Sequence, residues 1–254
     1  NGTLITQELV EIKSPGQGLQ PDRMDDLVGR VCQRKMIKGD FFFASDLKNK
    51  NEEPRAFTFK RPWGLPVRYH DFSRLIKKTN LDFLEFHLSY KDLEQDVSRF
   101  FKERLDLGLV VHCPELFQGD HLLNLAADDL SYRDRSIEEL QRVIDATKIL
   151  ASYFNQKDPV LLIVNVGGFT KDSALHPGKR IQLYDRVANS LSVLDTDGIE
   201  IIPQTMPPFP WLFGGQFFHN LFVNPREIVA FCQNYHYRIC LDVSHSKLAM
   251  NYEK

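Results

Sequence analysis

The sequence has few cysteines and no long hydrophobic run, and each of these absences excludes a class of protein. Four cysteines among 254 residues, with no CxxC spacing, lack the density of a disulfide-stabilised scaffold. No run of about 18 apolar residues predicts a membrane span. The first residues also lack the charged and apolar regions of a signal peptide. A cytoplasmic protein without a membrane partner is therefore expected, with the first residue lying inside a longer chain.

The sequence also lacks an excess of charge of either sign. Its 34 acidic and 32 basic side chains give a formal net charge of −2 at pH 7. A protein that binds nucleic acid through the phosphates needs a basic field, so nucleic acid is not expected as a partner. The hydrophobic content of 43% is enough for one large core or two smaller ones.

The first 47 residues combine short apolar segments with glycine turns, which is typical of a small β domain. Residues 1–9 are echoed by residues 38–47, since each copy has a Gly turn, a short apolar strand and an acidic residue before Leu. Between the copies, a turn cluster lies at residues 14–18 and a helical turn at residues 22–27, with Asp22 as its expected cap. Polar residues then predict a linker, which we place at residues 48–70.

These residues resemble the SAF, or antifreeze-like, domain that closes bacterial sialic acid synthases. The matching pieces are the turn at 14–19, the step at 27–30 and the turn at 37–40, which agree in order and spacing. In that family the domain opens with an Arg-bearing strand that reaches into a partner's active site. This chain is expected to begin after that strand, which implies a structural role for the domain here. The resemblance leaves a homodimer open.

From residue 71 to the end, apolar strands alternate with helical stretches, which predicts parallel pairing with right-handed crossovers. Residues 63–66 are expected to form a turn leading into this region. Helix starts are indicated by Ser136, followed by Glu139, and by Asn224 before Pro225. Strands are expected at residues 81–88, 109–113, 160–166, 199–203 and 239–243, and helices at 93–104, 136–154, 181–194 and 225–234.

Five βα units are fewer than the eight of a closed barrel. The fold class is therefore predicted to be α/β, a partial (β/α)8 TIM barrel over residues 71–254 that continues beyond the end of the chain. An open, doubly wound sheet is the alternative.

Polar side chains follow every predicted strand at the carboxyl end, where ligands bind in parallel α/β folds. A single His at such a position is more often a packed residue, but five positions in register predict a real site. Imidazole, carboxylate and amide groups together suit a divalent ion such as Zn²⁺, Mn²⁺ or Mg²⁺. In strand order, the residues are Glu85 and His87, then His112 and Glu115, then Asn165, then Gln204, then Asp242 and His245.

Residues 109–125, 161–169, 199–205 and 239–245 are similar to the xylose-isomerase-like barrels. That superfamily includes sugar phosphate isomerases, epimerases and DNA-repair enzymes of the endonuclease IV type. The resemblance places His112 on the second-strand His of the family, and Asp242 with His245 on the Asp-x-x-His after the fifth strand. It implies that a metal is held by His112, Gln204, Asp242 and His245.

Two positions depart from the family pattern. Asn165 stands where metal-rich members have a third-strand His, and Gln204 stands where the isomerases have a Glu that binds metal and helps proton transfer. A carboxamide can coordinate through oxygen but cannot act as a general base. The base is therefore expected to be Glu85, His87 or Glu115, or a residue on a strand beyond this chain.

Residues 206–216 are rich in Pro, Gly and aromatic residues, too irregular for a helix and too apolar for a solvated loop. We expect Trp211 to offer an apolar platform to a sugar face, with Gln216, His219 and Asn165 as further substrate-binding side chains. A loop that packs over the barrel mouth without binding anything is an equal alternative.

Together the two resemblances imply an enzyme of amino-sugar metabolism. A metal-dependent sugar isomerase or epimerase barrel would be fused to the SAF domain of a sialic acid synthase, with a sugar or amino sugar as its small-molecule partner. The alternative is a carbohydrate-binding barrel that has lost catalysis, which Asn165 and Gln204 favour. DNA repair is a third hypothesis, disfavoured by the net charge and the two missing ligands.

Overall fold

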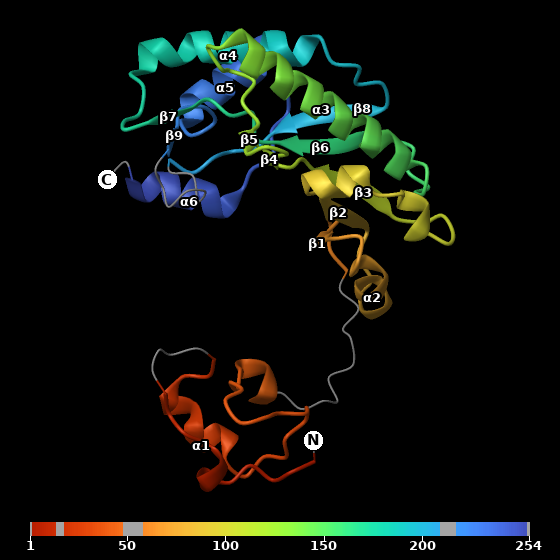
Figure 1. Cartoon of the computed structure of the whole chain (residues 1–254), viewed down its shortest axis with the longest axis vertical. Coiled ribbons are helices and arrows are strands. Elements are labelled where there is room, and N and C mark those ends of the chain that lie inside the picture. Colours follow the sequence, from red (N-terminus) through yellow and green to blue (C-terminus); the bar gives the residue numbers. More distant parts are fainter. Residues whose placement is uncertain (1, 14–17, 48–57, 209–216, 253–254) are drawn as a thin grey trace. The chain divides into compact units, whose positions relative to one another are not determined.

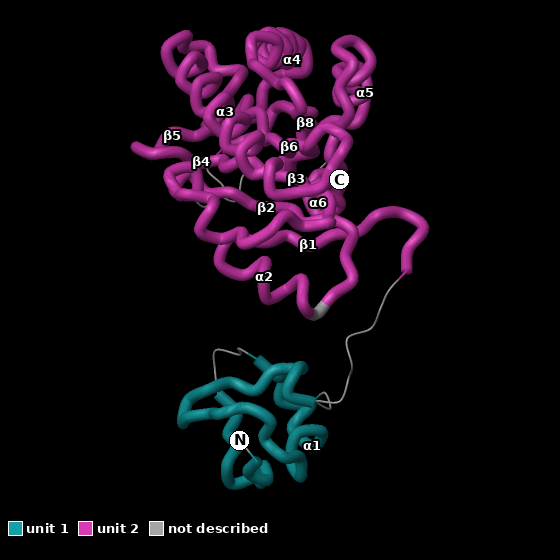
Figure 2. The backbone as a smooth tube through the Cα atoms, turned by 90° about the vertical axis from the view of Figure 1, so that its right-hand side faces the viewer, with its two compact units in different colours: residues 1–57 teal, residues 58–254 magenta. Residues whose placement is uncertain are grey.

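The computed structural model describes residues 2–13, 18–47, 58–208 and 217–252 and divides into two compact units, residues 1–57 and 58–254 (Figure 2). We call these unit 1 and unit 2.

Unit 1 contains little regular structure among its described residues. Leu4 and Val31 form a single antiparallel bridge, flanked by a hydrogen bond of 2.8 Å from Ile5 N to the carbonyl of Arg30. Its only α-helix in the described part is α1 (Met24–Leu27), and short 3-10 turns lie at Gln7–Leu9, Pro21–Arg23 and Ala44–Leu47.

Two local predictions for unit 1 were wrong. Asp22 does not cap α1, because the 3-10 turn that starts at Pro21 moves the cap position to Arg23, which makes no capping hydrogen bond. The second copy of the sequence echo, residues 38–47, forms no strand and ends in a 3-10 turn instead.

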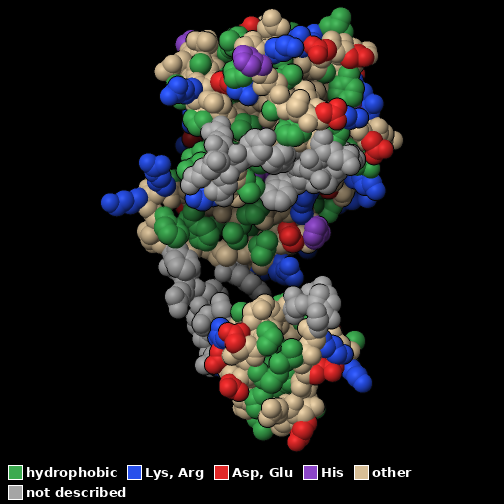
Figure 3. Space-filling model, turned by 90° about the vertical axis from the view of Figure 1, so that its left-hand side faces the viewer, with side chains coloured by type: hydrophobic (Ala, Val, Ile, Leu, Met, Phe, Trp, Pro, Cys, Tyr) green, Lys and Arg blue, Asp and Glu red, His purple; other side chains and the backbone are tan. Residues whose placement is uncertain are grey.

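Unit 1 buries little and exposes much apolar surface. Ile5 and Leu27 are its buried hydrophobic residues among those described, whereas Leu9, Ile12 and Ile37 are at least 62% exposed. Hydrophobic side chains gather on the face of the smaller body that Figure 3 shows.

Unit 2 is built on a five-stranded parallel sheet in the order β1-β2-β3-β6-β8 (Figure 1). Leu84 on β2 pairs with Leu109 on β3, and Val160 on β6 pairs with Ile199 on β8. Parallel order with helical crossovers confirms the predicted α/β fold of a partial TIM barrel. The strands are β1 (Gly64–Val67), β2 (Phe83–His87), β3 (Gly108–His112), β6 (Val160–Val164) and β8 (Ile199–Pro203).

Strand β1 lies where the sequence predicted a turn. A side chain at Gly64 would meet Phe83 at 2.4 Å, so glycine is what allows this strand to approach β2. Pro66 is tolerated because β1 is an edge strand of the described sheet.

The fifth predicted strand, residues 239–243, is reduced to one parallel bridge between Gln204 and Cys240. Cys240 N donates to the carbonyl of Pro203 at 2.8 Å, and Thr205 N donates to the carbonyl of Cys240 at 3.0 Å. Helix α6 (Val243–Tyr252) starts directly afterwards and ends the pairing.

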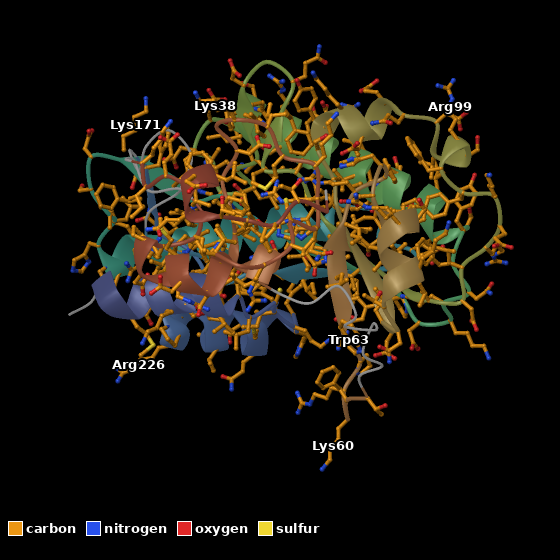
Figure 4. The ribbon with its side chains drawn as sticks, turned by 90° about the horizontal axis from the view of Figure 1, so that it is seen from below. Lys38, Lys60, Trp63, Arg99, Lys171 and Arg226 are labelled. Atoms are coloured by element: carbon orange, nitrogen blue, oxygen red, sulfur yellow. The ribbon has the colours of Figure 1, made fainter. Side chains whose placement is uncertain are left out.

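Three longer helices lie on one side of the sheet in both backbone views (Figures 1 and 2). They are α3 (Leu130–Ala151), α4 (Pro177–Ser192) and α5 (Pro225–Tyr235). Their inner faces bury Leu140, Val187 and Phe231, among others, against the strands. Charged side chains such as Arg99 and Arg226 extend outward from unit 2 (Figure 4). No helix in the described ranges is long and apolar enough to cross a bilayer.

Helix starts were predicted with mixed success. Asn224 caps α5 as expected, since its Oδ1 accepts from Arg226 N at 2.9 Å. Helix α3 begins six residues before Ser136, because Asp129 caps it and Ser136 lies buried inside it.

The predicted helix at 93–104 does not form. The described backbone makes two 3-10 turns instead, at Tyr90–Glu94 and Val97–Arg99. The side chains of Asp92 and Asp96 bond to nearby backbone N–H groups, which competes with a continuous helix.

Two short hairpins follow the sheet strands. One pairs β4 (Leu116–Phe117) with β5 (His121–Leu122), and the other pairs β7 (Phe169–Lys171) with β9 (Phe217–His219). Because they follow β3, β6 and β8, they bring polar side chains to the carboxyl-terminal edge of the sheet.

Candidate active site

Three side chains, from the end of β3 and the start of α6, meet around Gln204, which follows β8. Its Oε1 lies 2.9 Å from His112 Nε2, and its Nε2 donates to Asp242 Oδ2 at 3.0 Å. His245 Nδ1 lies 3.5 Å from the same amide nitrogen. The structure thus brings together all four residues that the sequence nominated as metal ligands. We call His112, Gln204, Asp242 and His245 the Gln204 cluster.

Backbone pairing places these residues. Gln204 N donates to the carbonyl of Val164 at 3.1 Å, which extends the pairing of β8 with β6 by one residue. Asp242 N donates to Thr205 Oγ1 at 2.9 Å, and Asp242 Oδ1 accepts from His245 N at 2.8 Å. One carboxylate oxygen therefore serves the start of α6, while the other faces Gln204.

Hydrogen bonds keep Asp242 ionised. Burial by itself would raise the pKa of this carboxyl group, but hydrogen bonds from Ser244 and from the backbone of His245 outweigh it and hold the pKa below the usual range. Asp242 is therefore a carboxylate, an acceptor only, at neutral pH.

His112 is neutral at the same pH. Burial lowers the pKa of this imidazole, and the electrostatic interaction with the neighbouring imidazole of His87 lowers it further. Its Nδ1 lies 3.1 Å from the carbonyl oxygen of Cys113, and a carbonyl can only accept. When Nδ1 carries the single proton, the lone pair of Nε2 faces Gln204 Oε1, which is also an acceptor.

The hydrogen bonds that link Cys113, His112, Gln204 and Asp242 need one more hydrogen than these groups supply. The ends are both acceptors, the carbonyl of Cys113 and the carboxylate of Asp242, and three contacts join them through His112 and Gln204. A neutral imidazole and one amide supply hydrogens for only two of the three, whichever tautomer or amide orientation is chosen. One cation, either a proton on His112 or a metal ion, would satisfy the third.

The donor set fits a divalent ion only with the help of the carboxamide. In the described part of the chain, no three His, Cys, Asp or Glu side chains gather closely enough to hold a metal. Gln204 supplies the missing donor through Oε1. A hydrogen bond from His112 Nδ1 to a backbone carbonyl is also the arrangement that orients metal-binding histidines.

Glu85 and His87 lie beside the cluster on β2. Glu85 Oε1 is 2.5 Å from His87 Nε2, and the His87 ring stacks on that of His112 with centroids 4.5 Å apart. The parallel register explains the stack, since His87 pairs directly with His112. Glu85 and His87 point the same way because alternate residues of a strand share a face.

The remaining described candidates line a separate small cavity of about 20 Å³. Asn165 Nδ2 donates to Glu115 Oε1 at 3.2 Å, and His219 is only 6% exposed. Burial lowers the pKa of His219 to about 4, with a further contribution from the charge of His245. We call this space the Glu115 cavity; it is lined by Glu115, Leu122, Leu123, Asn165, Phe169, Phe217 and His219. Trp211 and Gln216 fall outside the described residues.

Several residues that contact the site were not predicted from the sequence. The carbonyl of Thr205 lies 3.0 Å from His245 Nδ1, and Asn124 Oδ1 accepts from Gly168 N at 2.9 Å. The signal for the second was the Gly167-Gly168 pair, because two glycines after a strand indicate a turn with positive φ. Phe169 and Phe217 gave no signal beyond their apolar character.

A parallel α/β sheet with polar clusters at the carboxyl ends of its strands is the arrangement of a barrel-type protein, a class in which ligands bind at that edge. Comparison with family models matches residues 73–253 to the xylose isomerase-like TIM barrel and residues 1–48 to the SAF domain. The chain belongs to the xylose isomerase-like TIM barrel family, which accounts for most of its length.

Several solved structures are similar to this chain at low sequence identity. A D-tagatose 3-epimerase-like protein is 19% identical, with a TM-score of 0.46 over 71% of this chain and 65% of its own. L-ribulose 3-epimerase is 15% identical, with a TM-score of 0.45 over 75% and 62%. D-allulose 3-epimerase from Methylomonas sp., in complex with D-allulose, is 16% identical, with a TM-score of 0.40 over 68% and 55%.

The chain spans 55 to 65% of the length of these three structures. A comparison with curated proteins gave no match.

Proposed function

We propose that this chain is part of a metal-dependent sugar isomerase or epimerase that acts on an amino sugar. The observation that supports the proposal is the deficit of one cation in the Gln204 cluster. A partly buried site with a carboxylate, two imidazoles and an amide oxygen suits a divalent ion such as Zn²⁺, Mn²⁺ or Mg²⁺. When bound, the ion would polarise a sugar carbonyl and stabilise the negative charge that develops when a neighbouring C–H loses its proton.

His87 is the residue that we assign as general base in place of Gln204. Its Nε2 faces Glu85, so a proton on Nε2 is held by the carboxylate and Nδ1 becomes the basic nitrogen. Glu85 then stabilises the imidazolium that forms when the proton is taken. Glu115 is a weaker candidate because its carboxylate already accepts from Asn165.

The amino-sugar assignment rests on the SAF domain at residues 1–48. A sialic acid synthase condenses an N-acylmannosamine-type sugar with phosphoenolpyruvate, and an epimerase on the same chain would supply that sugar. We place the protein in the cytoplasm and include a homodimer in the proposal, with the domains at residues 1–47 and 71–254 joined by the linker at 48–70.

Exchange of the sugar C2 proton with deuterated water tests this function. N-acetyl-D-mannosamine and N-acetyl-D-glucosamine serve as probes with Mn²⁺ or Zn²⁺, and deuterium incorporation is followed by NMR. His87→Asn should lower the exchange rate by about 10²-fold or more, the usual effect of losing a general base. His70→Asn is the matched control, because His70 is a solvent-exposed histidine of unit 2.

A carbohydrate-binding barrel without catalysis is the second candidate. The observation in its favour is that the Gln204 amide links His112 to Asp242 at the position where a catalytic carboxylate is expected. Sugar binding by calorimetry without exchange at any of the metals would reject the enzyme in favour of this candidate.

A further inference from the structure

The side chain of His219 has a buried polar atom that the fold leaves unsatisfied. Among the described residues, only His219 Nδ1 and Glu227 Oε2 are buried without a hydrogen-bond partner. Glu227 keeps its other oxygen in an ion pair with Arg180 at 2.7 Å. An unpaired polar atom of this kind costs about 1–3 kcal/mol, so His219 is the position where a bound group would gain most.

The backbone holds His219 firmly in place. It pairs with Phe169 across the β7–β9 hairpin, and the next residue, Asn220, binds both sides of the turn. Asn220 Nδ2 donates to the carbonyl of Gly168 at 2.9 Å, and its Oδ1 accepts from Leu175 N at 2.6 Å. The unsatisfied nitrogen therefore belongs to a side chain that the hairpin fixes at the wall of the Glu115 cavity.

The other polar groups of the cavity limit what can bind there. Both polar atoms of the Asn165 amide already form hydrogen bonds, since its Nδ2 donates to Glu115 and its Oδ1 accepts from Gly167 N. What the wall still offers is the carboxylate of Glu115 and the imidazole of His219, which burial keeps neutral. Two acceptors favour a ligand group that donates a hydrogen bond, and a hydroxyl also suits the other imidazole tautomer.

The size of the cavity decides between hydroxyl and larger groups. Its volume of about 20 Å³ exceeds the roughly 10–15 Å³ that one water needs by the same measure. One hydroxyl fits, whereas an acetamido group is several times too large. The rest of the wall is apolar, with Phe169, Phe217 and Leu123 placed to contact the C–H groups beside the hydroxyl.

We propose that the Glu115 cavity is a subsite for a single sugar hydroxyl, with His219 Nδ1 as the hydrogen-bond partner that makes the protein select for it. The subsite lies close enough to the Gln204 cluster for His219 to be affected by the charge of His245. It thus recognises part of the sugar other than the acetamido group. That the ligand is a sugar rests on the proposed function; the requirement for a hydroxyl rests on the cavity itself.

Calorimetric binding of N-acetyl-D-mannosamine and of its 4-deoxy and 6-deoxy analogues tests the subsite. We expect one deoxy analogue to bind the wild-type protein about tenfold or more weakly, which corresponds to about 1.4 kcal/mol. His219→Phe should weaken binding of the parent sugar by the same factor and abolish the discrimination. His219→Asn, which keeps an amide near the position of Nδ1, should restore part of it, and His70→Phe is the surface control.

A second measurement does not depend on any variant folding. In protein labelled with ¹⁵N-histidine, the Nδ1 resonance of His219 should shift when the parent sugar is added and should stay unchanged with the discriminated analogue. Equal binding of all three sugars, no binding of any of them, or an unmoved Nδ1 resonance would overturn the subsite. Discrimination without deuterium exchange would support the subsite and reject the catalytic function.

Discussion

Gln204 shows how one atom type changes what a site can do. A carboxylate at this position would bring a negative charge and a general base, whereas the carboxamide brings an acceptor at one end and a donor at the other. The donor end bonds to Asp242, and the acceptor end faces His112. In the function proposed above, proton transfer therefore falls to β2, where Glu85 and His87 form a close pair.

His219 should make the stability of unit 2 depend on pH. Its pKa falls from 6.5 to about 4 on folding, so the unfolded chain binds the proton more readily. The contribution of neutral His219 to the free energy of unfolding is fully present above pH 6.5. Up to about 3 kcal/mol of it is lost as the pH falls from 6.5 to 4. Urea unfolding between pH 7.5 and 4 measures this loss.

The same series with His219→Asn isolates the histidine from other titrating groups. The variant should be less dependent on pH over this interval than the wild-type protein. Parallel pH profiles for the two proteins would contradict a buried neutral imidazole at this position.

The turn after β6 is the element that brings the two parts of the site together. Gly167 and Gly168 both have positive φ, at +84° and +77°, and the chain turns there towards Asn124 and the β7–β9 hairpin. A Cβ on Gly167 would lie 2.5 Å from Asn124 Cα and 2.7 Å from the carbonyl oxygen of Leu123. Backbone atoms cannot move aside cheaply, so this turn requires glycine.

Gly167→Ala should therefore destabilise unit 2 more than strain in φ alone explains. Gly198→Ala is the matched control, since Gly198 has φ of +72° but no atom within 4 Å of an added Cβ. We expect about 1–2 kcal/mol for the control from φ alone and at least 1–3 kcal/mol more for Gly167, both by urea unfolding. Equal losses at the two glycines would show that the close approach to Asn124 is absent in solution.

At the scale of the whole molecule, the two units differ in how much they bury. Unit 1 has two buried hydrophobic residues among those described, whereas one continuous core runs through unit 2. A domain of about 60 residues buries a smaller share of its surface than a larger one and is only marginally stable. The units should therefore unfold separately, with unit 1 at the lower temperature.

Differential scanning calorimetry with one core variant in each unit tests this independence. Leu27 is 2% exposed in unit 1, and Leu140 is fully buried in unit 2. Each Leu→Ala change should cost about 2–5 kcal/mol, with Leu27→Ala lowering only the first transition and Leu140→Ala only the second. A single transition that both variants shift would contradict two independent units.

The sequence by itself determined those features that depend on local pattern. Short apolar segments that alternate with helical stretches predicted β2, β3, β6 and β8. Since carboxyl ends of parallel strands share one edge, the gathering of His112 and Gln204 also followed from strand order alone.

Only the tertiary structure decided the rest. Strand β1 exists because Gly64 can approach Phe83, and residues 239–243 pair only at Cys240 because α6 begins at Val243. The orientation of the Gln204 amide and the orphaned nitrogen of His219 depend on contacts between residues tens of positions apart. Periodicity carries no information about such contacts, because hydrogen-bond geometry and burial are set by the packing of the whole unit.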